Sequence, residues 1–238
     1  MSSRRIGLLG GTFDPIHMGH LDLASAAWDA LQLTELLVIP ANVPPHRPKP
    51  LTSSFHRFAM VALAVAGRAG WRASDVELRH EAPSYTSTTL QRFHRRGYQP
   101  VELFFLIGAD AFSAIHTWRD FPRILDQAHF AVVSRSGNGV EGLRERLPVL
   151  AERMTHVGPG TTIDTAKPSI FLIDHATADV SSTAIRSILA GGGSIEGMVD
   201  DRVRQHIDQH GLYGSSSPDR RRAAPHVDPA AGRLHGQD

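Results

Sequence analysis

The segment GGTFDPIHMGH, residues 10–20, joins a short apolar run to a stretch of helical periodicity, and it decides the fold. The run at residues 6–9 is apolar and ends at a glycine pair, which is typical of a buried parallel strand. Across residues 19–33 apolar side chains recur at helical spacing, and residues 36–39 form a second apolar run closed by Pro40. Strand, loop, helix and strand in this order predict the opening βαβ unit of a parallel sheet.

The rest of the chain continues this alternation of strands and helices. The pattern predicts a doubly wound, mostly parallel α/β sheet in a single domain, with ligands outside the carboxyl ends of the strands. We expect the ordered domain to span residues 1–214. Residues 215–238 contain almost no large apolar side chain, which predicts a disordered tail. The further expected strands are 76–78, 101–107, 130–134 and 169–173, and the further expected helices are 56–69, 87–96 and 182–190.

Composition narrows the function classes. The 238 residues include no cysteine, which excludes disulfides, thiolate nucleophiles and cysteine-ligated zinc. The formal net charge of +1 does not by itself favour binding to nucleic acid or to an anionic membrane. The three arginines at 220–222 are only a weak indication of a nucleic-acid-binding site. No stretch reaches the roughly 20 apolar residues that cross a bilayer, and no secretory signal is visible. We therefore expect a soluble cytoplasmic protein without nucleic-acid or membrane partners; the sequence leaves a homo-oligomer open.

The first glycine loop has the composition of a phosphate site. Gly10 and Gly11 let the backbone turn tightly and approach a ligand, and the helix that follows offers unpaired N–H groups and a positive dipole end. His17 and His20 are three residues apart, so at a helix start their side chains can converge on one oxyanion. The alternatives are a glycine-rich turn with two incidental surface histidines, or a metal site that lacks a neighbouring set of carboxylates.

A second segment, VSSTAIR at residues 180–186, follows the strand expected at 169–173 and begins a helix. Hydroxyls and free N–H groups at a helix start bind phosphate, and Arg186 adds a cation with bidentate geometry. By itself the segment is more typical of an ordinary helix cap than of a phosphate site.

Together the two segments resemble a known enzyme superfamily. His17-Met18-Gly19-His20 resembles the HxGH signature of nucleotidyltransferases, and residues 180–186 resemble the same superfamily's (I/V)SSTxIR motif. The resemblance implies a Rossmann-like nucleotidyltransferase fold. It also implies that the two segments act on one triphosphate.

Four further strings point to the bacterial nicotinate-nucleotide adenylyltransferases. They are PPHR at 44–47, SYT at 84–86, IGAD at 107–110 and Trp118, in that family's order, and the resemblance extends over residues 5–213. It implies transfer of the adenylyl group of ATP to nicotinate mononucleotide, giving nicotinate adenine dinucleotide and pyrophosphate, a late step in NAD biosynthesis. No covalent enzyme intermediate is needed, and Mg²⁺ is expected to arrive bound to ATP without a protein metal cage.

The resemblance implies roles on the ATP side of this reaction. His17 and His20 are the expected catalytic residues, stabilising the transition state at the triphosphate, with His20 the stronger candidate. The expected ATP and phosphate ligands are Gly10, Gly11, Thr12, His46, Arg47, Ser182, Thr183 and Arg186.

The resemblance also implies a second set of ligand residues, which would bind the mononucleotide. Trp118 is expected to stack on the pyridine ring, Gly108 and Asp110 to bind ribose hydroxyls, and Thr86 to help hold the nicotinate carboxylate. From the residues alone, Trp118 could equally belong to the core and Asp110 could be a helix N-cap. Outside this set, Arg135 fits a surface arginine better than a ligand.

Two departures from the family pattern affect substrate contacts. Thr88 stands where the family often has Asp, and Arg47 stands where it often has Lys, which changes the geometry of the charge. The alternatives are therefore the same chemistry on nicotinamide mononucleotide or another phosphate acceptor, or a nucleotide sensor without turnover.

Overall fold

The structure is a computed structural model that describes residues 4–44, 50–134, 140, 142–158 and 160–214. Within these ranges seven strands form one sheet in the order β3-β2-β1-β4-β5-β7-β6, and every pairing is parallel. The strands are β1 Ile6–Gly11, β2 Glu35–Pro40, β3 Trp71–Ala73, β4 Leu103–Gly108, β5 His129–Val133, β6 Met154–Val157 and β7 Ile170–Ile173.

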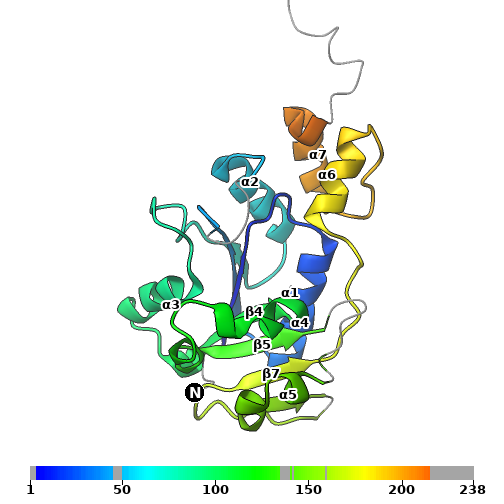
Figure 1. Cartoon of the computed structure of the whole chain (residues 1–238). Coiled ribbons are helices and arrows are strands. Elements are labelled where there is room, and N and C mark those ends of the chain that lie inside the picture. The colour runs from blue at the N-terminus through cyan, green and yellow to red at the C-terminus, as the bar shows by residue number, and fades with distance from the viewer. Residues whose placement is uncertain (1–3, 45–49, 135–139, 141, 159, 215–238) are drawn as a thin grey trace, which may run out of the picture.

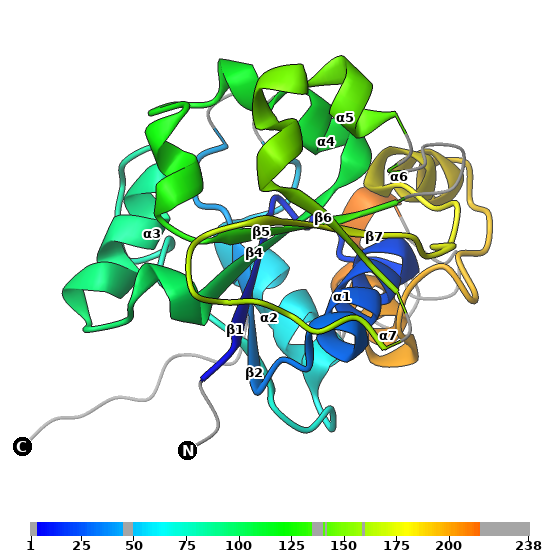
Figure 2. The same cartoon turned by 90° about the horizontal axis from the view of Figure 1, so that it is seen from below.

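Helices connect the strands and cover both faces of the sheet. Figure 2 shows α1, α2 and α7 on one side, and α3, α4 and α5 on the other. This arrangement confirms the expected doubly wound α/β fold. The α-helices are α1 Met18–Leu31, α2 Ser54–Val65, α3 Thr86–Arg95, α4 Ala109–Ser113, α5 Leu143–Arg146, α6 Ser182–Ala190 and α7 Asp201–His210. The 3₁₀ helices are Pro100–Glu102, Ile115–Thr117, Arg123–Asp126, Pro148–Arg153 and Leu212–Gly214.

The alternation of side chains along each strand builds two apolar layers. Leu9 of β1 and Phe104 of β4 belong to the cluster beneath α1 and α2, whereas Leu8 and Phe105 belong to the cluster beneath α3 and α4. Because successive side chains of a strand point to opposite faces, one strand serves both layers. The central strands therefore read as continuous apolar runs.

Strand order reverses between β1 and β4, which are neighbours in the sheet but far apart in the chain. The chain runs outward from β1 through β2 to β3 and then returns to start the other half at β4. Such a switch point leaves a crevice outside the carboxyl ends of the strands. In Figure 1, α2, α6 and α7 gather at the end of the molecule where β1 leads into α1.

The expected strand at residues 76–78 is wrong. The third strand is β3, whose last pairing joins Ala73 to Val38. The chain then leaves the sheet in a turn, in which the Arg79 N–H donates to the Asp75 carbonyl at 3.2 Å. Val76 is buried in that turn, so its apolar character reflects packing and not strand pairing.

The elements that were not expected include β6 and α7. Both lie in stretches that carry little apolar signal: β6 buries only Met154 fully, and α7 buries only Val203 and Ile207. The disordered tail expected at 215–238 lies outside the described residues and stays a prediction.

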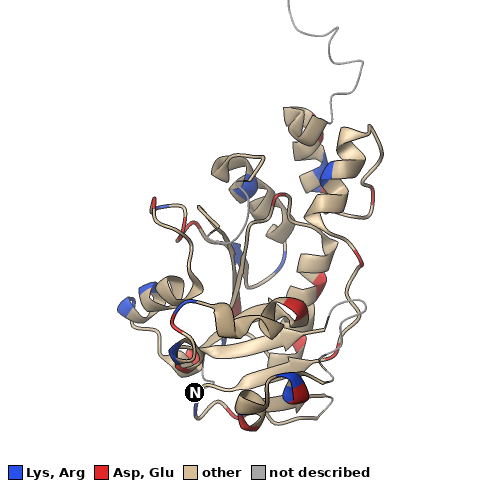
Figure 3. Cartoon of the chain, in the orientation of Figure 1, with Lys and Arg blue, Asp and Glu red and all other residues tan. Residues whose placement is uncertain are grey.

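Charged residues are spread over the described elements, as Figure 3 shows, with basic and acidic residues interspersed along the ribbon. None of the described helices has the length and apolar character needed to span a membrane.

Candidate active site

The loop between β1 and α1 folds back on its own phenylalanine. A side chain at Gly11 would place its Cβ 2.8 Å from the Phe13 ring, so glycine is required for this approach. Phe13 itself adopts a positive φ of 51° and is buried. The loop therefore passes over the ring and delivers residues 14–17 to the start of α1.

His17 and His20 form the first turn of α1. His17 is the N-cap, and the pair makes a reciprocal capping box. The two rings stack with centroids 3.6 Å apart, and the backbone N–H of His17 donates to Nδ1 of His20 at 3.3 Å. Because Nδ1 of His20 accepts this bond, the neutral ring carries its proton on Nε2, where it can donate to an oxyanion.

Asp14 is a buried carboxylate that anchors the loop. It accepts hydrogen bonds from the Leu51 N–H at 2.7 Å, the Thr52 N–H at 3.3 Å and the Tyr213 hydroxyl at 2.6 Å. The Thr52 hydroxyl donates to it as well. Burial, together with the bond to Asp14, raises the pKa of Tyr213 far above its usual range, so this hydroxyl remains a donor. The carboxylate is thus occupied in holding the fold and is not a ready metal ligand.

Arg57 links the same loop to the end of β2 by hydrogen bonds. Its side chain is 1% exposed and donates to the carbonyls of Thr12 and Ala41, each at 2.7 Å, and of Asn42 at 3.4 Å. Burial lowers the pKa of Arg57, and the neighbouring Asp14 acts in the opposite direction. One buried cation therefore satisfies carbonyls of two strand-end loops at once.

The start of α6 contacts the first loop directly. Ser182 Oγ donates to the carbonyl of Pro15 at 2.9 Å. Arg186 donates through Nη1 to the carbonyl of Asp14 at 2.8 Å and through Nη2 to Thr183 Oγ1 at 3.2 Å. The two helix starts that the sequence singled out thus lie together, as expected.

Gly19 allows the segment before α6 to pack on α1. A Cβ at Gly19 would lie 2.9 Å from the carbonyl oxygen of Ala178, a distance real contacts do not reach. Asp22, one turn further along α1, accepts a hydrogen bond from the Ala178 N–H at 2.8 Å. The glycine between the two histidines is therefore explained by a close backbone approach.

Three of the residues expected on the mononucleotide side lie at the end of β4 and the starts of α3 and α4, and Trp118 follows the 3₁₀ helix Ile115–Thr117. Thr86 is the first residue of α3 and is half-buried, and Gly108 ends β4. Asp110 is exposed in the first turn of α4; the N-cap there is Gly108, so the alternative of an Asp110 cap is wrong. Trp118 is half-buried, and its ring lies nearly perpendicular to that of Phe105 with the two ring centroids 6.0 Å apart, so the indole packs partly on the core.

A buried acid lies beneath α3. Glu77 is 7% exposed and accepts a hydrogen bond from the Thr89 hydroxyl at 2.6 Å. Burial raises the pKa of Glu77, and the hydrogen bonds from Thr89 and Ser84 offset this in part. The Asn42 N–H donates to Ser84 Oγ at 2.9 Å, which joins the segment before α3 to the loop after β2.

Three residues considered from the sequence, His46, Arg47 and Arg135, lie outside the described residues. Conversely, sequence reasoning missed the supporting roles of Arg57, Thr52 and Tyr213. Among the described residues, a hollow of about 700 Å³ lies between the end of α1 and residues 157–158 and 160–163, and none of the predicted site residues lines it.

Two helix starts that meet beyond the switch point, one with stacked imidazoles and one with hydroxyls and a guanidinium, define a nucleotidyl-transferring enzyme. A family model described as cytidylyltransferase-like matches residues 8–188. Relatives named "Probable nicotinate-nucleotide adenylyltransferase" match most of the chain. The one from Desulfatibacillum aliphaticivorans is 38% identical over 218 residues, covering 88% of this chain and 99% of that relative. The one from Pseudomonas fluorescens is 39% identical over 215 residues, covering 88% and 97%.

The chain belongs to the cytidylyltransferase-like family and, within it, to the nicotinate-nucleotide adenylyltransferases. Among solved structures, Plasmodium falciparum nicotinic acid mononucleotide adenylyltransferase complexed with APC has a TM-score of 0.67 at 18% identity, covering 90% of this chain and 98% of that one. The same enzyme complexed with NaAD has a TM-score of 0.65 at 17% identity, with the same coverage. At this identity the likeness shows the fold, and it confirms the expected nucleotidyltransferase architecture.

Proposed function

We propose that this protein transfers the adenylyl group of ATP to nicotinate mononucleotide, giving nicotinate adenine dinucleotide and pyrophosphate. The observation that carries the proposal is the pair of bonds from Ser182 and Arg186 to the carbonyls of Pro15 and Asp14, which sets both helix starts at one place. Membership among the nicotinate-nucleotide adenylyltransferases supports the choice of both substrates.

The reaction is a direct in-line displacement. A phosphate oxygen of the mononucleotide forms a bond to the α-phosphorus of ATP. The bond from that phosphorus to the oxygen bridging the β-phosphate breaks, and its electron pair leaves with pyrophosphate. Such a transfer depends on positioning and on stabilising negative charge.

His20 stabilises the charge that develops on the α-phosphate. Its Nδ1 accepts the His17 N–H, so Nε2 is the atom that carries the donor proton. The start of α1 adds its dipole and backbone N–H groups on the same side, with Gly10, Gly11 and Thr12 lining the approach. His17 is buried and stacks on His20, so it holds the His20 ring in place. The imidazole of His17 is also a second contact for the triphosphate.

The start of α6 closes over the phosphates of ATP from the other side. Arg186 has five N–H donors in a planar fork, so it can hold the Asp14 carbonyl and Thr183 while it donates to phosphate. Thr183 is exposed and Ser182 is half-buried, so their hydroxyls stand at the surface of the site.

Mg²⁺ enters as part of the ATP substrate. The donors around the site are imidazoles, hydroxyls and a guanidinium, whereas this hard ion prefers carboxylate, phosphate and water oxygens. Asp14, the carboxylate of the loop, already accepts bonds from Thr52 and Tyr213. Phosphate oxygens and waters would therefore hold the ion.

With these nucleotide substrates, the proposed place of the reaction is the cytoplasm.

The nicotinate mononucleotide binds at the end of β4 and the start of α3. Trp118, which packs against Phe105, stacks on the pyridine ring, and the exposed Asp110 contacts the ribose. Gly108 leaves room for this carboxylate, because a Cβ there would lie 2.7 Å from Asp110 Oδ1. Thr86, at the start of α3, holds the nicotinate carboxylate with the helix N-terminus.

The test is an assay of the full chain with ATP, Mg²⁺ and one acceptor at a time, with release of pyrophosphate as the readout. We expect nicotinate mononucleotide to be the preferred acceptor over nicotinamide mononucleotide and phosphopantetheine. A strong preference for either competitor would refute the choice of acceptor. Binding of ATP without turnover on any of them would show a sensor and refute the enzymatic proposal.

A further inference from the structure

Three histidines outside the candidate active site gather between α2 and α7. His56 lies in the first turn of α2, and His206 and His210 lie on α7. One ligand nitrogen from each lies within 4.8 Å of the other two, and Nδ1 of His56 is 3.1 Å from Nε2 of His206. Two of these side chains are half-buried and that of His210 is exposed, so solvent can reach the group.

The backbone explains why the three rings converge. His206 and His210 are four residues apart on one helix, which places both on the same face. Histidine pairs at this spacing on a helix are a recurrent way of holding a transition metal. The third ring comes from a separate helix, so the group is made by the packing of α2 on α7.

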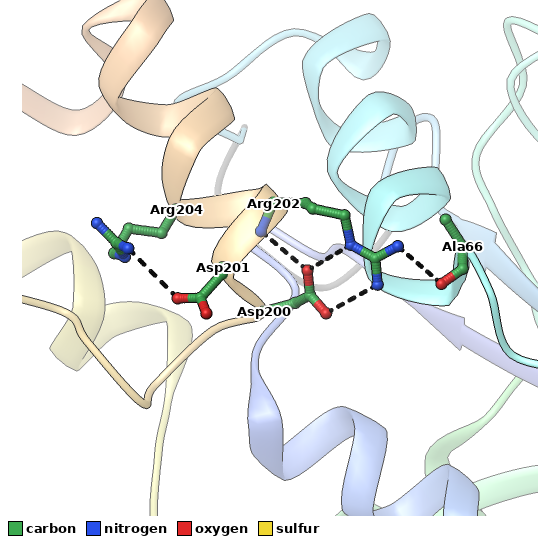
Figure 4. A network of polar contacts seen from close by, with 5 residues as sticks. All are labelled: Ala66, Asp200, Asp201, Arg202 and Arg204. Carbon is green, nitrogen blue, oxygen red and sulfur yellow. Dashed lines mark hydrogen bonds and ion pairs between the residues drawn. The ribbon is translucent and has the colours of Figure 1, made fainter.

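The helix pair is fixed independently at its other end. Figure 4 shows Arg202, in the first turn of α7, donating to the carbonyl of Ala66 at the end of α2, a bond of 2.9 Å. Its guanidinium also bonds the Asp200 carboxylate at 3.0 and 3.2 Å. Between the two ends, apolar residues such as Val61 and Val203 share one buried cluster. The histidines therefore converge on a preformed frame.

We propose that His56, His206 and His210 bind one Zn²⁺ ion, with water as the fourth ligand. Imidazole nitrogens are ligands that Zn²⁺ favours, and three protein ligands with an open fourth position is an established coordination for it. At a Zn–N distance of about 2.0–2.1 Å, tetrahedral geometry separates ligand nitrogens by about 3.3 Å. The His56–His206 separation of 3.1 Å is close to that value, and the exposed His210 can rotate to complete the set.

The histidine group is close in sequence to the two side chains, Arg57 and Tyr213, that hold the phosphate loop, residues 12–17 between β1 and α1. His56 immediately precedes Arg57, which holds the carbonyls of Thr12 and Ala41, and His210 lies three residues before Tyr213, which holds Asp14. An ion at this point would link α2 to α7 close in sequence to the residues that make those contacts. Its role is therefore to brace the fold, and it does not depend on the reaction proposed above.

The experiment uses the full chain without a histidine tag, freed of metal with a chelator and titrated with ZnCl₂ in a calorimeter. We expect one Zn²⁺ per chain and, with the ion at about 100 times its dissociation constant, a rise in Tm of roughly 5 °C or more. Co²⁺ should replace it and give the visible absorption of a tetrahedral nitrogen site. Absence of stoichiometric binding by the unaltered protein overturns the proposal.

Variants decide whether these three rings are the ligands. His210→Ala changes an exposed side chain and so keeps the fold, and His206→Ala with His210→Ala removes two ligands. Loss of an outer partner of a ligand costs about 10–100-fold in affinity, so loss of a ligand itself should cost no less. His156→Ala, at an exposed position on β6, is the matched control and should bind Zn²⁺ as the unaltered chain does. Retained binding and an unchanged Tm shift in His210→Ala would place the ion elsewhere and refute the assignment.

Discussion

The phosphate side of the site and its mononucleotide side are built in different ways. Around the phosphate loop the expected residues already contact one another and the backbone, as Ser182 does with Pro15 and Arg186 with Asp14. On the mononucleotide side Asp110 is exposed, and Trp118 packs only partly on the core. The residues proposed to act in nucleotidyl transfer are thus held by the fold itself, whereas those proposed to select the acceptor lie at its margin.

The largest effect should come from the phosphate side. Replacing His20 by Ala removes the Nε2–H donor, and loss of one such donor typically lowers kcat by about 10²–10³-fold. Binding of ATP, measured by calorimetry, should stay close to that of the unaltered protein. His156→Ala is the control and should leave kcat unchanged. A kcat for His20→Ala within twofold of the original would remove His20 from the mechanism.

The second prediction tests whether the hydrogen bond from Tyr213 to Asp14 stabilises the phosphate side of the site. Tyr213→Phe removes the hydroxyl that donates to the buried Asp14 carboxylate at 2.6 Å. Hydrogen bonds to charged groups contribute about 1.5–3 kcal/mol, so we expect the free energy of unfolding in urea to fall by that amount. The KM for ATP should rise as well, because Asp14 holds the loop. Tyr98→Phe, whose ring packs on Phe93 on the opposite face of the sheet, is the control, and an equal loss there would contradict the prediction.

On the mononucleotide side we expect a smaller and more selective effect. Trp118→Ala removes a ring whose stacking is worth about 0.5–1.5 kcal/mol, so the KM for nicotinate mononucleotide should rise roughly 2–12-fold. The KM for ATP should stay the same, and Trp118→Phe should restore most of the affinity. Equal increases in both KM values would mean that Trp118 supports the core and does not read the acceptor.

The smallest effect concerns the acid beneath α3. Burial raises the pKa of Glu77 in the folded state above that of the unfolded chain. The folded state therefore binds this proton more tightly, and the stability linked to it is full at low pH and is lost as pH rises through the folded pKa. Glu77→Gln keeps an acceptor for Thr89 without the charge.

Unfolding in urea between about pH 4 and 7 measures this difference. Relative to Glu77→Gln, the unaltered protein should lose stability as pH rises. A relative gain with rising pH would show that the carboxylate is stabilised and not penalised by its surroundings.

How far the sequence could predict the fold depended on the local signal of each element. The helix expected at 182–190 has those bounds in the structure, because a serine cap begins it and a glycine run follows it. The strand expected at 76–78 failed because Val76 is buried in a turn, and apolar character alone does not distinguish the two. Helix α7 was missed because its buried face consists of Val203 and Ile207 alone.

In the candidate site, too, residues with local roles could be predicted from the sequence and residues with long-range roles could not. Glycines, histidines and helix-start hydroxyls are readable in sequence because their roles are local. Arg57 resembles any helical arginine until the carbonyls of Thr12 and Ala41 converge on it, and that convergence exists only in the folded chain. The substrate-binding roles of Thr86, Gly108, Asp110 and Trp118 remain predictions.

The bond between Tyr213 and Asp14 joins positions 199 residues apart. Asp14 emerges from the ribosome long before Tyr213, so the loop that contains Asp14 lacks this anchor until Tyr213 has been made. A chain that ends before Tyr213 would keep every strand of the described sheet and the N–H donors of Leu51 and Thr52, and would lack the tyrosine hydroxyl. Full anchoring of the loop therefore has to wait for the segment around Tyr213.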